Sequence, residues 1–517
     1  ESGVTLTIEA GVTVKFDSGT GLQIKGELLA RGTSVSPIVF TSSQSSPAKG
    51  DWAAIDFFDQ ATDAVFDSNG DYASGSIIEY AQIRYGGGGG KSAAITATSA
   101  ALSLNQLTVD YSDSSGIAVI GVSGGGTIPV TKITNSTINN NDAHGVYCDC
   151  YRLNGSITVS DNTITGNGSS GIDTGGGSSG GSHTFVFTNN VISSNGGVGI
   201  SGQANGTQTI TGNTVRDNGN HGIRTHGNGT YTIQSNTVTG NTGIGIYGSY
   251  TTHIIDDNTI VSNGGGIKIY YGGNYTITDN LIARNTAADG SAFTSAGAWS
   301  PTVSIEGNVI TQNSCTGTPT CSTILTFQPS SGDPAFTVSG NNIFDNTATY
   351  EIDNNRSISL SNIDASNNWW GTNDQSTIQA KIYDWSDGDA SIGIVDYSPY
   401  LPTATTTPPV SPPTGVAATP GPTTIAFTWD ANPESDTAGY KVHYDTDAAG
   451  YPYATSVDVG NLTSYTLPSL NTGTTYYTAV SAYDSDGNES WYSSDTASTA
   501  QSTPTTMVFL IQPSGAS

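Results

Sequence analysis

The sequence predicts an all-β chain: a right-handed, three-sided parallel β-helix followed by a separate β-sandwich. Three observations predict it. A short motif recurs at a regular step through the middle of the chain, Gly, Ser, Thr and Asn dominate the composition, and the pattern changes after a Pro- and Thr-rich stretch. We expect the β-helix over 1–401, a stiff linker over 402–413, the sandwich over 414–500 and a tail over 501–517.

The repeat has the form Asn-x-[Ile/Val]-x-x-Asn. The steps between the first Asn of successive copies are 28, 23, 23, 22, 22, 28 and 33. Three strands of about five residues, with three turns, fill roughly 22 residues, so one step is one coil. A left-handed hexapeptide helix does not suit this step. The longer steps are expected to carry surface insertions. The first Asn of each copy is Asn162, Asn190, Asn213, Asn236, Asn258, Asn280, Asn308 or Asn341.

These Asn residues are expected at bends, where a side-chain amide can pair with the backbone and with its equivalent one coil away. Asn does not titrate, so a residue that recurs once per coil indicates architecture rather than catalysis. The Ile and Val residues between them are expected to stack into one continuous core. The repeat therefore predicts a ladder of amides along a rod.

Both ends of the β-helix have recognisable patterns. The alternating segments 4–16, 21–30 and 77–86 resemble the opening coils of pectin-lyase-like surface proteins, and this resemblance covers 1–90. At the other end, 367–372 (Asn-Asn-Trp-Trp-Gly-Thr) and 393–401 look like the last coil of right-handed β-helix repeat proteins on microbial cell surfaces. Large aromatic side chains can close a stacked core, so Trp369 and Trp370 are expected to cap it.

The segment after the linker resembles a fibronectin type III domain through Ile425-Ala-Phe-Thr-Trp429, Gly439–Tyr444 and Leu470–Tyr483. The resemblance implies that Trp429 lies in the sandwich core and that Leu470 and Tyr476 form a tyrosine corner. Such modules act as spacers or weak binding units, so it implies no catalysis.

The chain carries a formal net charge of −28 with only 15 Lys and Arg residues. Binding to nucleic acid is excluded because it requires cations that neutralise phosphates. No apolar run is long enough to span a membrane, so direct membrane insertion is not expected. We expect a secreted protein at the cell surface, and Glu1 indicates processing or a fragment of a longer chain.

Cysteine usage agrees with an oxidising compartment. Cys315 and Cys321 bracket a short loop and are expected to form a disulfide. Cys148 and Cys150 lie two residues apart, near the limit for a mutual bond. For this second pair, free thiols and a strained bridge both remain open.

Calcium is the cation that the sequence favours. Three segments, 67–71, 384–389 and 484–488, place oxygen ligands at nearly alternate positions around a Gly turn, as calcium loops do, but lack the bidentate Glu. Asx turns without metal are the alternative. The candidate ligands are Asp67, Asn69, Asp71, Asp384, Asp387 and Asp389.

Tyrosines in adjacent coils form a candidate surface for stacking sugars, although tyrosine also suits strands in general. They are Tyr247, Tyr250, Tyr270, Tyr271 and Tyr275. Ionisable residues on the coils offer weaker catalytic candidates, which we expect to be solvated surface side chains. They are Asp217, Asp256, Asp257, Asp279, Arg224, Lys268, Arg284, His221, His226 and His253.

The sequence thus favours an extracellular structural or adhesive protein over an enzyme. A head-to-tail filament is one form of this hypothesis, in which the apolar segment 506–511 of one copy docks on another. The alternative is a polysaccharide-binding protein, or a polysaccharide lyase or hydrolase with the pectin-lyase-like fold. Extracellular polysaccharide and further copies of the chain are therefore the expected partners.

Overall fold

The computed structural model describes residues 1–121, 127–149, 154–175, 183–203, 205–296, 301–317, 321–327, 329 and 332–502. The chain forms two compact units, Glu1–Pro402 and Thr403–Ser517. Each unit is described by itself below.

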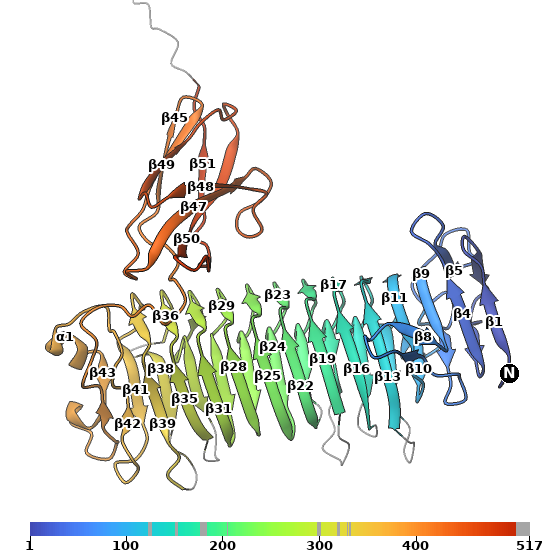
Figure 1. Ribbon diagram of the computed structural model, residues 1–517, viewed down its shortest axis with the longest axis horizontal. Coiled ribbons are helices and arrows are strands. Elements are labelled where there is room, and N and C mark those ends of the chain that lie inside the picture. Colours follow the sequence, from blue (N-terminus) through green and yellow to red (C-terminus); the bar gives the residue numbers. More distant parts are fainter. Residues whose placement is uncertain are drawn as a thin grey trace, which may run out of the picture. The chain divides into compact units, whose positions relative to one another are not determined.

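The first unit is a parallel β-helix with three strands in each regular coil (Figure 1). One such coil consists of β22 (Gly206–Thr211), β23 (Thr214–Arg216) and β24 (Ile223–His226). Each strand pairs in parallel with its equivalent in the next coil, β25 (Gly229–Gln234), β26 (Thr237–Thr239) and β27 (Ile246–Ser249). The predicted fold class is confirmed.

Two long sheets result from this stacking. Strands equivalent to β22 and β23 join a 26-stranded sheet, and strands equivalent to β24 form a 14-stranded sheet. In order, the 14-stranded sheet contains β3 (Leu22–Ile24), β6 (Ile55–Phe57), β10 (Ala93–Thr98), β12 (Ser115–Ile120), β15 (Val146–Asp149), β18 (Ile172–Asp173), β21 (Ile200–Gly202), β24, β27, β30 (Ile267–Tyr270), β34 (Phe293–Ala296), β38 (Ser322–Phe327), β41 (Tyr350–Asn355) and β43 (Ile382–Tyr383).

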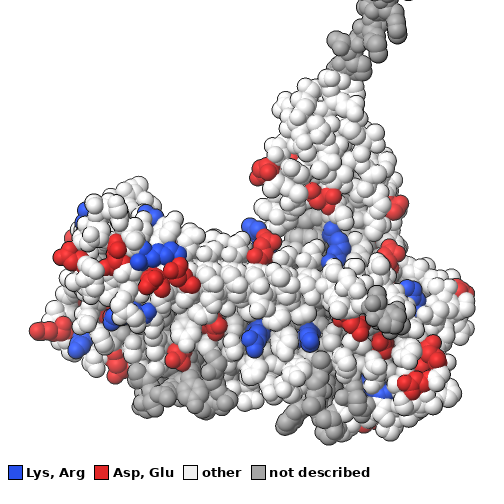
Figure 2. Space-filling model, turned by 180° about the vertical axis from the view of Figure 1, so that it is seen from behind, with Lys and Arg blue, Asp and Glu red and all other residues white. Residues whose placement is uncertain are grey.

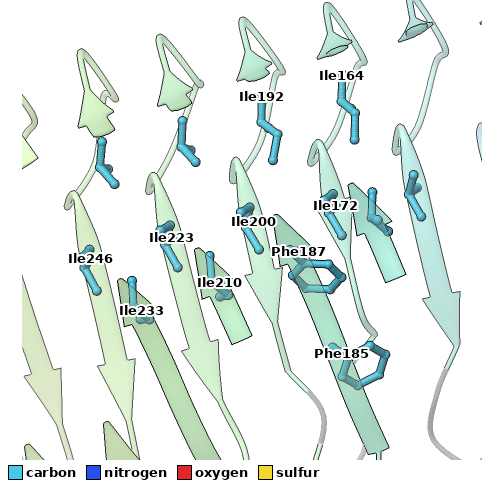
Figure 3. Packing of buried hydrophobic residues seen from close by; sticks show 14 of the residues in the cluster. Ile164, Ile172, Phe185, Phe187, Ile192, Ile200, Ile210, Ile223, Ile233 and Ile246 are labelled. Atoms are coloured by element: carbon cyan, nitrogen blue, oxygen red, sulfur yellow. The ribbon is translucent and has the colours of Figure 1, made fainter. Parts of the chain in front are cut away.

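The core is a set of aliphatic columns along the rod. Equivalent residues of successive coils, such as Ile200, Ile223 and Ile246, lie side by side in a row along the rod (Figure 3). All three are fully buried, and burial of such a side chain stabilises the fold by about 1.5–3 kcal/mol. Because the parallel register repeats in every coil, the alternating pattern of each strand sends the same positions inward.

Two buried asparagine ladders run beside these columns, and the predicted ladder is confirmed. In the first ladder, the amide nitrogen of each Asn donates to the side-chain oxygen of the next, for example Asn236 to Asn258 at 2.9 Å. The second ladder consists of the second Asn of each repeat, as in Asn241 to Asn263 at 3.0 Å. The residue before a ladder Asn takes a left-handed conformation, such as Asp257 with φ 53°, which makes the bend.

The C-terminal coils end the ladders and close the core. Asn368 is the last member of the first ladder, and its amide donates to the carbonyls of Val338 and Ala365 at 2.6 and 2.7 Å. Trp370 is buried in the core, and Trp369 packs on Phe344 with ring centroids 5.0 Å apart. The end also contains α1 (Gln375–Gln379), a 3-10 turn (Trp385–Asp387) and β44 (Val395–Asp396).

The second unit is a β-sandwich of two antiparallel sheets. One sheet contains β45 (Ala417–Gly421), β46 (Thr424–Thr428) and β49 (Ser464–Leu467). The other contains β48 (Thr455–Gly460), β47 (Thr437–Asp445), β50 (Thr475–Asp484) and β51 (Thr496–Thr499). Trp429 lies in its core, and the hydroxyl of Tyr476 accepts a bond of 3.1 Å from the backbone N–H of Asn471. Both features agree with the implied fibronectin type III fold.

Candidate functional site

A strip of polar side chains follows the outer face of the 14-stranded sheet. The strand register places Asp173, Ser201, Arg224, Tyr247 and Lys268 side by side, one per coil. Neighbouring strands lie about 4.8 Å apart, so Arg224 and Lys268 flank Tyr247 directly. We call Asp173, Arg224, Tyr247 and Lys268, together with His221, the cationic strip.

His221 is held in this strip as a neutral ring. It stacks on Tyr247 with ring centroids 5.2 Å apart, and its Nδ1 accepts a bond of 3.0 Å from the backbone N–H of Ile244. Burial, together with the charges of Arg224 and Lys268, lowers its pKa to about 4. Because Nδ1 accepts, the proton of the neutral ring is on Nε2.

Asp173 lies at one end of the cationic strip, and Lys268 lies at the opposite end. Burial raises the pKa of its carboxyl, whereas the N–H of Gly175 and the charges of His144 and Arg224 oppose this rise. His144 lies 3.9 Å away, and burial lowers its pKa. Burial therefore disfavours the charged form of both partners, which makes this a weak ion pair.

Among the residues that the structure describes, Arg224 and Lys268 form no ion pair within 4 Å. This is notable in a chain with 43 acidic and only 15 basic side chains. The central coils show few charged side chains in the view of Figure 2, and mixed charges gather over the N-terminal coils. Two cations beside a tyrosine ring suit an anionic sugar, because the ring stacks on the sugar and the cations bind its carboxylate.

Four of the five predicted sugar-stacking tyrosines lie together. Tyr250 stacks on Tyr271 with centroids 4.6 Å apart, and Tyr271 meets Tyr270 edge to face at 4.1 Å. Burial raises the pKa of Tyr247, and Tyr270, Tyr271 and Tyr250 raise it further, so these rings are close to the strip. Each of the four is partly exposed.

Tyr275 and His253 are predicted at the surface, and this is wrong for both. They lie inside the β-helix with 1% and 0% exposure, in one column with Tyr231. The ring of His253 stacks between the two tyrosines, 4.8 Å from each, and its Nε2 lies 2.8 Å from the hydroxyl of Thr225. The sequence signal that was missed is the alternation of sides along a strand. Each of these three residues precedes a buried Ile by two positions, so its side chain points to the same, inner side.

The acidic catalytic candidates lie apart from Arg224 and Lys268, whereas Arg284 follows the strand Leu281–Ala283 in the same sheet as the acids. Asp256, Asp257 and Asp279 lie at bends of the 26-stranded sheet, where burial and the other two carboxylates raise the pKa of Asp279. Arg224 and Lys268 instead lie on the 14-stranded sheet. Asp217 is paired with Arg216 at 2.7 Å. The described residues therefore offer no pair of these acids beside the cationic strip.

The calcium candidates use their carboxylates to hold turns. Asp67 accepts bonds from the backbone N–H groups of Asn69 and Asp71, both at 2.9 Å. Asp384 accepts from Ser386 and Val395, also at 2.9 Å, and Asp387 accepts from the N–H of Asp384 at 3.0 Å.

Asp389 accepts from the N–H of Ser391 at 2.9 Å, and its pKa is lowered by the hydroxyl and N–H of that residue. Within the described part of the chain, no three His, Cys, Asp or Glu side chains are grouped to hold a metal. Calcium binding stays a prediction.

The structure joins Cys315 and Cys321 in a disulfide, the pairing that the sequence predicts. Cys148, at the end of β15, is also disulfide-bonded, so the alternative of a free thiol does not hold for it. Cys150 lies outside the described residues.

No helix in the described part of the chain is long and apolar enough to cross a membrane.

Solved structures similar to part of this chain include fibronectin type III proteins. One is a Fn3-like protein from Clostridium thermocellum, with 31% identity over 19% of this chain and 97% of that one, and a TM-score of 0.15. Another is the FN1-FN3 segment of chicken CNTN1, with 26% identity, 18% coverage of this chain, 32% of that one and a TM-score of 0.16. This chain thus spans about a third of the latter. No curated protein matches it.

Two family models match the chain. The fibronectin type III domain matches 411–498. The right handed beta helix region matches 92–254 and 203–370, which together cover more than half of the sequence. The chain therefore belongs to the right-handed β-helix family and carries a C-terminal fibronectin type III domain.

Proposed function

We propose that this chain is an extracellular structural and adhesive protein, in which the β-helix serves as a stiff rod. The observation that carries the proposal is the pair of uninterrupted asparagine ladders, which extend from Asn162 to Asn368 and from Asn141 to Asn346. Both domain types fit such a role. Secretion and a place at the cell surface are part of the proposal.

The ladders support stiffness because every rung is bonded to both neighbouring coils. The side-chain oxygen of Asn258 accepts from the amide and the backbone N–H of Asn236, at 2.9 and 3.0 Å. The amide of Asn258 in turn donates to Asn280 at 2.9 Å and to the carbonyl of Ile233 at 2.9 Å. Bending the rod would open buried bonds, each of which costs about 1–3 kcal/mol to leave unmade.

Head-to-tail assembly remains a proposal about partners. The proposed docking segment, 506–511, lies outside the described residues. Electron microscopy of the purified chain, with and without calcium, tests assembly and the predicted cation together. Filaments would support both ideas if they required calcium, whereas monodisperse rods in both buffers would contradict assembly.

A second candidate function, the binding of an acidic polysaccharide, is favoured by the cationic strip. Arg224 and Lys268 flank Tyr247 at the spacing of adjacent strands. Cleavage of the bound chain by a lyase or hydrolase mechanism is the stronger form of this proposal.

Native electrophoresis through gels that contain polygalacturonate tests both the binding and the adhesive role. The chain should be retarded, and the double variant Arg224→Ala/Lys268→Ala should lose most of the retardation. Lys15, an exposed residue of β2 (Thr13–Phe16), provides the control, because Lys15→Ala removes a cation elsewhere. Equal mobility in gels with and without the polymer would contradict acidic-polysaccharide binding. Ultraviolet absorbance of unsaturated products, or new reducing ends, would distinguish an enzyme from a binding protein.

A further inference from the structure

A cluster of aromatic rings lies on the fibronectin type III domain, outside its core. Tyr451 and Tyr453 come from the loop between β47 and β48, and Trp491 and Tyr492 come from the segment between β50 and β51. Tyr451 lies 5.1 Å from Trp491, and Tyr453 lies 5.1 Å from Tyr492, measured between ring centroids. None of the four belongs to the buried core of the sandwich. We call these four residues the aromatic patch.

A bulge in the backbone presents two of these rings. The N–H groups of Ser490 and Ser493 bind the carbonyls of Ala482 and Val480 at 2.8 and 2.7 Å. The two serines are three residues apart, whereas their partners on β50 are two apart, so the segment that pairs with β50 carries one extra residue. That extra residue falls at Trp491 and Tyr492. A bulge of this kind re-aims side chains and is common beside binding sites.

Polar groups surround the rings. The hydroxyl of Tyr453 donates to Asp495 at 2.7 Å. His443, whose ring meets Tyr492 edge to face at 4.7 Å, lies 2.8 Å from the hydroxyl of Ser481. Ser481 donates to Glu489 at 2.5 Å. Burial would raise the pKa of Glu489, but hydrogen bonds from His443, Lys441 and Ser481 outweigh it and lower the pKa to about 2, so the carboxylate stays ionised.

These features match the chemistry of a pyranose sugar, which has an apolar face for stacking and hydroxyls for hydrogen bonds. Charge selects the kind of sugar. Residues 403–502 contain ten Asp and Glu and a single cation, Lys441, so an anionic sugar would be repelled. We infer that the aromatic patch binds a neutral polysaccharide, separately from the cationic strip of the β-helix.

Electrophoresis of the full chain through gels that contain galactomannan, xyloglucan or hydroxyethylcellulose tests this inference. At least one polymer should retard the chain. Trp491→Ala and Tyr451→Ala should each weaken that binding about ten-fold, because each removes a stacking surface. Tyr451→Ala is the safer variant, since this residue is 37% exposed. Trp491→Phe, which keeps a ring, should retain most of the binding.

Two comparisons make the result specific. Trp385 of the β-helix is 50% exposed, more than Tyr451, so Trp385→Ala removes an accessible ring elsewhere and should leave retardation unchanged. Arg224→Ala/Lys268→Ala should also have no effect in neutral gels, which separates this inference from the proposed function of the strip. Normal mobility in all three polymers would overturn the inference. So would a protein partner that Trp491→Ala releases while no polymer binds.

Discussion

The side-chain amide of Asn236 donates to the side-chain oxygen of Asn258 at 2.9 Å, in the middle of the first ladder. That oxygen also accepts the backbone N–H of Asn236 at 3.0 Å. One oxygen atom therefore satisfies two buried donors from the neighbouring coil, and this relationship repeats along the rod.

Replacing Asn258 with Ala should destabilise the β-helix strongly. The change leaves the backbone N–H of Asn236 buried without its acceptor, while the side-chain amide of Asn236 keeps its bonds to the carbonyls of Ile210 and Gln234. The expected cost is about 1–3 kcal/mol in the free energy of unfolding. Calorimetric unfolding of the intact chain measures the loss. Asn274→Ala, at an exposed position of β31 (Gly273–Thr278), should change stability by less than about 0.5 kcal/mol. Equal effects of the two variants would contradict the structural role of the ladder.

Acidification should destabilise the β-helix through His253. Burial lowers the pKa of its ring to about 4, from 6.5 in the unfolded chain. The unfolded state therefore binds more protons between these values, and stability should fall as the pH drops from 6.5 to 4, by about 3 kcal/mol from this residue. His253→Phe should flatten the dependence of the unfolding temperature on pH in this window. An unchanged slope would show that the ring titrates normally.

Glu351 should have the opposite effect on the pH dependence of stability, and destabilise the β-helix as the pH rises. Its carboxyl is buried on β41, where burial raises the pKa to about 7 and outweighs the charge of Lys381 and the hydrogen bond from Asn346. The protonated form is favoured in the fold, so its contribution is present below pH 4.5 and is lost as the pH rises through 7. Glu351→Gln should therefore stabilise the chain at pH 8 by about 2–3 kcal/mol and have little effect at pH 4. Unfolding in urea at both pH values measures this change. A Glu351→Gln variant that is less stable than the natural chain at pH 8 would contradict the prediction.

The tyrosine corner should contribute to the sandwich alone. Tyr476→Phe removes the bond of 3.1 Å from the N–H of Asn471, at a cost of about 0.5–1.5 kcal/mol. Because the two units are separate, the unfolding transition of the fibronectin type III domain should move and that of the β-helix should not. Tyr465→Phe serves as the matched control, since Tyr465 is a partly buried tyrosine of β49. A shift of both transitions would contradict independent unfolding.

The repeat predicts the architecture because it encodes two periods at once. The step from one copy to the next, such as that from Asn236 to Asn258, gives the coil, and the Asn pair within each copy gives both ladders. The position of a residue along a strand shows which side it faces, and residue type does not. Residue type predicts Tyr275 as a surface ring, whereas its position two residues before Ile277 places it inside.

The sites are harder to predict because they depend on register between coils. Arg224, Tyr247 and Lys268 belong to three different coils and become neighbours only when equivalent strands pair. The aromatic patch escapes sequence reasoning for a related reason. Its rings come from two loops, and the bulge that presents Trp491 has no signature in composition.

The length of the ladder hydrogen bonds does not depend on the number of residues in the coil between them. Asn280 reaches Asn308 across 28 residues and Asn308 reaches Asn341 across 33, both at 3.0 Å, as tightly as the shorter steps. Extra residues can therefore be inserted into a coil without changing the pitch of the rod. Selection can replace what the surface displays, one loop at a time, while the shaft beneath keeps its mechanical properties.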